Sequence, residues 1–197
     1  MAGERNVPTD PHALALLRGG ARAAVTVAVL GLHLRGAVEA GRTGTMRTSG
    51  PAPQGPLPAL AKAVHATLYR PAGLRQLLER QGVRKALAAQ RAELVAEGML
   101  RRTLPGPTRA ARQALKRLRS RHPLPAHPTP HNRRSGLSPD DQLLLVALHG
   151  DKALTLLAPR FTREAGLTGR GGTTERGLRQ SWSTGGTGGF SCGDAHA

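Results

Sequence analysis

Residues 10–36, DPHALALLRGGARAAVTVAVLGLHLRG, hold two apolar segments that are separated by a pair of glycines. Thr9 or Asp10 can cap a helix, and Pro11 suits its first turn. The Gly-Gly pair predicts the end of this helix, and a second helix follows over residues 21–35 until the next glycine. Because the middle of the second helix is apolar on every side, we expect it to be buried.

A short β-hairpin is expected after this second helix. Residues 37–40 and 45–48 lie on either side of a glycine-containing turn, a pattern that predicts two short antiparallel strands. A linker rich in proline and glycine, SGPAPQGPLP, follows at residues 49–58. Helices followed by a small hairpin are typical of a winged-helix unit, and we assign the first such unit to residues 10–50.

A second unit with the same plan is predicted over residues 57–104. It has expected helices at 57–68, 73–80 and 84–97, and a small hairpin after residue 98. With an offset of 62 residues, five positions of the first unit match five of the second: Arg22, Val25, Leu32, Gly36 and Val38 fall on Arg84, Leu87, Leu94, Gly98 and Leu100. This match predicts a tandem repeat. The apolar helix of the first unit then has two candidate partners, the second unit or another protein.

A basic helix and a linker are expected next. Residues 107–121 predict an amphipathic helix with an apolar face formed by Ala111, Ala114, Leu115 and Leu118. Residues 122–137 contain four prolines and predict an extended linker.

The last segments complete the predicted architecture. Ser138 is expected to cap an apolar helix, which opens a helical hairpin over residues 138–167 whose second arm Pro159 closes. The glycine-rich residues 168–197 are expected to be disordered. The predicted fold class is therefore mainly α, with two tandem winged-helix-like units that carry small hairpins, then a basic helix, a helical hairpin and a disordered tail.

The charge of the chain is concentrated in one segment. The 197 residues carry 29 basic and 12 acidic side chains, and residues 101–134 contain ten of the basic and none of the acidic ones. Four of these cations have helical spacing and are expected to line one face: Arg109, Arg112, Lys116 and Arg119. Such a stripe can contact several phosphates, which gives binding that depends on salt but not on sequence. The segment has no aromatic side chain for base stacking, and the alternative is a solvated surface helix.

The opening motif resembles that of a group of bacterial proteins. Asp10 and Pro11, followed by LALLRGG at residues 14–20, resemble the D-P-x-x-L-A-x-L-R-G-G motif of an uncharacterised actinobacterial family. Members of that family often carry membrane segments and end in tails rich in glycine and cysteine. The segments LLLVALHGDKAL at residues 143–154 and GGFSCG at residues 188–193 agree with the resemblance, but this chain passes directly from the second unit to the basic helix and keeps a single cysteine. The resemblance implies a fold and an actinobacterial lineage, and no activity.

Two further patterns lack the neighbours that their chemistry needs. Three histidines fall in a proline-rich run where no carboxylate or thiol completes a metal site. They are His122, His127 and His131. The tail holds the side-chain types of a hydrolase triad with nothing to fix their geometry: Ser191, Asp194 and His196. We therefore predict no catalytic residue, no cofactor and no metal site.

These observations favour a non-enzymatic scaffold or protein-interaction module, with an unknown protein partner or self-association. The alternative is sequence-non-specific binding of nucleic acid or of an anionic membrane surface through residues 101–134. Sequence-specific DNA binding is disfavoured, because the predicted helix of the first unit is apolar and that of the second carries Glu93 and Glu97 beside its cations. No small-molecule substrate is implied.

The location of the protein is predicted from its apolar segments. The N-terminus lacks the apolar core of a secretory signal. The longest apolar stretch, residues 23–34, is shorter than the roughly 20 residues of a membrane span. We expect a cytoplasmic protein, with the inner face of the membrane as the alternative.

Overall fold

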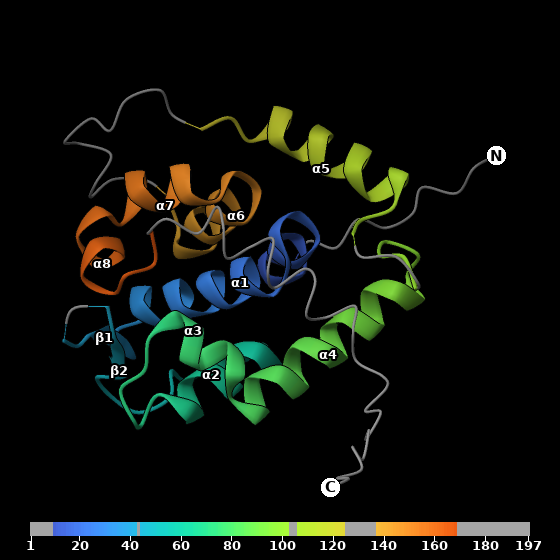
Figure 1. Ribbon diagram of the computed structural model, residues 1–197. Coiled ribbons are helices and arrows are strands. Elements are labelled where there is room, and N and C mark those ends of the chain that lie inside the picture. Colours follow the sequence, from blue (N-terminus) through green and yellow to red (C-terminus); the bar gives the residue numbers. More distant parts are fainter. Residues whose placement is uncertain (1–9, 43, 103–105, 125–136, 169–197) are drawn as a thin grey trace, which may run out of the picture.

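The computed structural model describes residues 10–42, 44–102, 106–124 and 137–168 (Figure 1). This part of the chain is mainly helical with one small antiparallel sheet, which confirms the predicted fold class at that level. In chain order, its elements are α1 (Pro11–Leu34), β1 (Val38–Ala40), β2 (Met46–Thr48), α2 (Ala59–Thr67), α3 (Leu74–Glu79), α4 (Gln81–Ala96), α5 (Arg109–Arg121), α6 (Pro139–His149), α7 (Asp151–Leu157) and α8 (Pro159–Glu164).

The longest helix, α1, begins and is interrupted where the sequence predicts. Asp10 accepts hydrogen bonds from the backbone N–H groups of His12 and Ala13, and Pro11 occupies the first turn. Gly20 leaves the helical conformation with φ 70° and ψ −162°, so α1 consists of two helical arms that meet at this residue. A positive φ of this kind is readily adopted by glycine and strained for other residues.

The second arm of α1 is buried inside the chain itself. Figure 1 shows α1 between α6 and α7 on one side and α2 and α3 on the other. Ala24, Val25 and all residues from 27 to 30 have no exposed surface. The packing against α6 is close at Gly31, where an added methyl group would lie 3.3 Å from Leu143 Cδ1. The described chain therefore covers the apolar helix without a second protein.

By length and composition, α1 is long and apolar enough to cross a membrane. Its 24 residues include both arms, which are joined across the non-helical Gly20, so α1 is longer than the apolar stretch 23–34 on which the sequence-based expectation rested. Buried core helices and signal sequences meet the same criteria, and 67% of the most apolar window of α1 is buried against the rest of the chain. Length and composition alone therefore do not assign α1 to a membrane.

The helices α1 and α4 end with the same backbone hydrogen bonds. After α1, Gly36 has φ 73° and the N–H of the next residue donates to Leu32 O at 2.9 Å. After α4, Gly98 has φ 69° and the N–H of the next residue donates to Leu94 O, also at 2.9 Å. The equivalent residues are 62 positions apart, which is the offset found in the sequence.

The hairpins that follow these two helices are similar in connection but not in length. The first pairs β1 with β2, with Val38 opposite Thr48. The second is reduced to one antiparallel bridge, between Leu100 and Pro107, so the predicted second pair of strands is not formed among the described residues. Proline has no N–H group to donate, and this limits the ladder at that position.

A hydroxyl residue closes both hairpins in the same way. The N–H and Oγ of Ser49 donate to Ala37 O and Gly36 O at 3.0 and 2.7 Å. At the end of the second hairpin, Thr108 donates from its N–H to Met99 O at 2.9 Å and from its Oγ1 to Gly98 O at 3.1 Å. Counted from the glycine to the hydroxyl residue that bonds to it, the second hairpin is therefore three residues shorter than the first.

The region after residue 137 differs from the predicted helical hairpin. Ser138 and Asp141 form the expected reciprocal cap at the start of α6. Gly150, with φ 67°, ends α6 and directly precedes α7. The second arm, α7, ends at Leu157 just before Pro159, as expected, but Pro159 also begins a third helix, α8, because the first turn of a helix needs no N–H donor at that position.

Candidate anion-binding surface

The helix α5 is fixed to the protein by its N-terminal cap and by its apolar face. Thr108 Oγ1 accepts a hydrogen bond from the N–H of Ala111 at 3.3 Å, and it also contacts the carbonyl at the end of α4. Ala111 and Leu115 are buried, and Leu118 is half-buried against the core. The sequence predicted this face correctly, and α5 is left with an outward face that contains no apolar contact residue.

Three of the four predicted site residues lie along this outward face. Arg109, Arg112 and Lys116 are exposed, and α5 contains no acidic residue. With a rise of 1.5 Å per residue, the three cations extend over about 10 Å of the helix axis. We call these three residues the α5 stripe.

The α5 stripe has no carboxylate partner in the part of the chain that the structure describes. The ion pairs found there join residues of other elements: His12 with Asp10, Arg35 with Asp140, Arg47 with Glu39, Arg75 with Glu79, and Arg160 with Glu164. Within the described residues no carboxylate neutralises the stripe, which favours an anionic ligand at this surface.

The fourth predicted residue, Arg119, is also exposed, and it differs from the other three in having a hydrogen-bond partner on α6. Its Nε donates a hydrogen bond to Leu148 O at 2.9 Å, and Arg18 Nε donates to Ala147 O at 2.7 Å. Both carbonyls belong to the last turn of α6, where the helix dipole favours positive charge. Gly150 fits beside this contact, because an added Cβ there would lie 2.5 Å from Arg18 Nη1. Arg119 therefore holds α6 in place.

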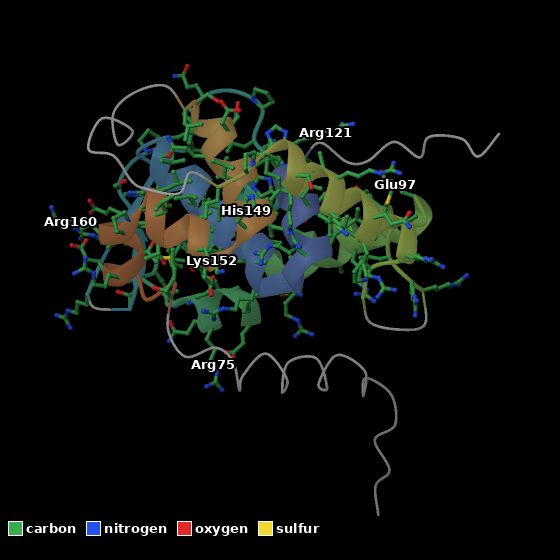
Figure 2. The ribbon with its side chains drawn as sticks, turned by 90° about the horizontal axis from the view of Figure 1, so that it is seen from above. Arg75, Glu97, Arg121, His149, Lys152 and Arg160 are labelled. Atoms are coloured by element: carbon green, nitrogen blue, oxygen red, sulfur yellow. The ribbon has the colours of Figure 1, made fainter. Side chains whose placement is uncertain are left out.

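The C-terminal ends of α5 and α6 meet at this contact. His149 Nε2 donates a hydrogen bond to His122 O at 2.8 Å, which joins the two helix ends. In Figure 2, Arg121 lies at the edge of the molecule formed by α5, whereas Arg75 and Arg160 lie at other edges. Of the three histidines in the predicted proline-rich run, His122 makes this backbone contact, and His127 and His131 lie outside the described residues.

Two exposed cations next to α5 were not singled out from the sequence. Arg101 and Arg102 lie in the turn of the second hairpin, just before the residues that lead into α5. Their proximity to the stripe depends on the bridge between Leu100 and Pro107, which is not evident from residue spacing alone.

A partly buried polar cluster lies at the start of α1. Asp10 accepts hydrogen bonds from His12 Nδ1 at 2.9 Å and from Gln90 Nε2 of α4 at 3.1 Å. Burial raises the pKa of Asp10, but the hydrogen bonds and charge of His12 outweigh it and hold the pKa below its usual value. His12 Nε2 and Gln90 Oε1 are buried without a partner among the described residues. The cluster joins α1 to α4 and includes no nucleophile.

The described residues contain no group of three or more His, Cys, Asp or Glu side chains that can hold a metal ion. The remaining candidates in the sequence, Ser191, Cys192, Asp194 and His196, lie outside the described residues. No protein-family model matches the chain, and no curated protein or solved structure matches it significantly. The function is therefore argued from the geometry of the α5 surface.

Proposed function

We propose that the protein binds phosphate-bearing polyanions through the α5 stripe, without recognising a sequence. The observation that carries this proposal is the outward face of α5, where Arg109, Arg112 and Lys116 are exposed with no carboxylate partner among the described residues. An anion that approaches this face meets no acidic side chain of α5. Three side chains of this kind contact phosphates by charge and do not distinguish bases.

The scaffold or protein-interaction function, with another protein or a second copy as partner, is our second proposal. In the sequence this function was favoured because the apolar segment of α1 needs a surface to pack against, but α6 and α2 provide that surface within the chain. Its present support is the outer face of α4, where Ala88, Ala89 and Ala92 are exposed. This support is weaker than that for polyanion binding, because exposed alanines are common on surface helices.

The finer parts of the architecture are proposals as well. The hydrogen bonds that recur at Gly36 and Gly98 support two winged-helix-like units at residues 10–50 and 57–104. An actinobacterial lineage, and a location in the cytoplasm or at the inner face of the membrane, rest on the sequence alone. A peripheral location agrees with an exposed cationic helix.

Fluorescence anisotropy with labelled duplexes of unrelated sequence tests the main proposal. The triple variant Arg109→Gln, Arg112→Gln, Lys116→Gln is expected to weaken binding at low salt by at least about tenfold for every duplex. The matched control is Lys62→Gln, Arg70→Gln, Arg75→Gln, which removes the same number of exposed cations from α2, α3 and the turn between them. Equal losses for the two variants, or no binding by the wild-type chain, would reject the proposal.

A further inference from the structure

The turns of the two hairpins have different surroundings. In the first hairpin, the N–H of Gly44 donates to Glu164 O at 2.9 Å, and an added Cβ at Gly166 would lie 3.0 Å from Gly44 Cα. The end of α8 therefore covers that turn. In the second hairpin, Arg101 and Arg102 are exposed, and neither forms an ion pair within the described residues. We call these two residues the turn arginines.

The turn arginines are held at the N-terminal end of α5. The N–H of Arg101 donates to Gly106 O at 3.4 Å, next to the bridge between Leu100 and Pro107. Thr108, which caps α5, donates two hydrogen bonds to the carbonyls of Gly98 and Met99. These contacts fix the start of the turn, the end of α4 and the start of α5 to one another. The backbone of the turn arginines is therefore held close to the N-terminal end of α5, where the stripe begins at Arg109.

We infer that the turn arginines and the α5 stripe form one contact for the backbone of duplex nucleic acid. This inference rests on the proposed function and adds both a ligand class and two residues to it. A duplex carries one phosphate charge for roughly every 1.7 Å of its axis, so a row of five cations meets a phosphate at each position. Such charge contacts supply nearly all of the affinity of sequence-independent binding.

An anionic membrane is the less favoured ligand because the surface provides only one of the two signals that stable membrane attachment needs. A polybasic patch usually acts together with a lipid chain or an inserted apolar face. In α5 the apolar side chains are already used, since Ala111 and Leu115 are buried and Leu118 is half-buried against the core. The described residues of this surface therefore offer charge without insertion.

The salt dependence of binding to a duplex counts the contacts and so tests the inference. For the full-length wild-type chain, five contacts predict a slope of log K against log salt of about −4.5, or an affinity loss of roughly 500-fold between 50 and 200 mM salt. The double variant Arg101→Gln, Arg102→Gln should reduce the slope to about −2.7 and the loss to roughly 40-fold. The matched control Arg70→Gln, Arg75→Gln removes two exposed arginines from α3 and the turn before it, which lie on the opposite side of α1 from α5 (Figure 1), and should leave the slope unchanged.

The outcomes separate this inference from the proposed function. If the wild-type chain binds duplexes through the α5 stripe but the turn variant keeps the wild-type slope, the turn arginines make no contact and the inference is wrong. If the chain prefers vesicles with 30% phosphatidylserine to duplex competitors, the ligand class is wrong although the surface is correct. If it binds neither, the proposed function itself fails. Circular dichroism of each variant checks that the helices are intact.

Discussion

The helices α1 and α4 end in the same way, yet one is a core helix and the other a surface helix. At the offset of 62 residues, Val25 matches Leu87 and Leu32 matches Leu94, and all four side chains are buried. Elsewhere the surroundings diverge: Gly31 of α1 packs against Leu143 of α6, whereas the matching residue of α4, Glu93, is exposed.

This difference shows that the apolar surface of α1 reflects coverage within the chain. One apolar stripe is enough for a helix that packs on one side, as α4 does. A helix that is covered by α6 and α2 from opposite sides must be apolar nearly all round, as α1 is. Arg101 and Arg102, the cations that follow α4, are exposed in the described part of the chain.

The largest expected effect comes from giving α1 the residue that α4 has at the matching position. Gly31→Glu would place a charge against Leu143, and burying an unpaired charge costs at least about 4 kcal/mol. This is comparable with the whole stability of many domains, so we expect unfolding or release of α6. Urea denaturation followed by circular dichroism measures the loss of stability.

Glu93→Ala in α4 is the control at the matching position. It should change the free energy of unfolding by less than about 0.5 kcal/mol. Similar denaturation midpoints for the two variants would contradict the difference between a core helix α1 and a surface helix α4.

A smaller effect separates the two roles of the arginines on α5. Arg119→Gln should lower the free energy of unfolding by about 1 kcal/mol, because it removes the hydrogen bond to Leu148 O at the end of α6. Its effect on the salt slope of duplex binding should be small. Arg112→Gln should leave the thermal midpoint unchanged and make the slope less steep by about 0.9. If the two variants behave alike in both measurements, Arg119 does not differ from the stripe.

The smallest effect concerns the contact between α1 and α4 at Asp10. Its pKa is lowered in the folded chain, so the stability it contributes is present above the unfolded pKa and is lost as pH falls through the folded pKa. Asp10→Ala removes the cap of α1 and should cost about 1 kcal/mol at neutral pH. Urea denaturation of both proteins at pH 7 and at pH 3 or below should show the difference shrinking in acid. A constant difference would mean that the carboxylate charge is not involved.

Features set by neighbouring residues were predicted from the sequence, and features set by distant contacts were not. The cap at Asp10, the break at Gly20, the first hairpin and the apolar face of α5 all depend on patterns within a few residues. By contrast, the covering of α1 by α6 joins Gly31 to a residue more than a hundred positions away.

The same limit applies at the candidate site. Helical spacing grouped Arg119 with the stripe, but spacing does not show that the Nε of Arg119 also reaches Leu148 O. Pro159 correctly indicated the end of α7, but the same residue also suits the first turn of a helix, and the helix that it begins, α8, was not predicted.

The salt slope of the α5 triple variant tests the central claim most directly. Duplex binding by the wild-type chain and by Arg109→Gln, Arg112→Gln, Lys116→Gln is measured by anisotropy at several salt concentrations. The account predicts that the variant keeps the wild-type melting temperature within a few degrees and that its slope is less steep by about 2.7, or 0.9 for each lost phosphate contact. An unchanged slope in a folded variant would contradict the claim that the α5 stripe is the anion-binding surface.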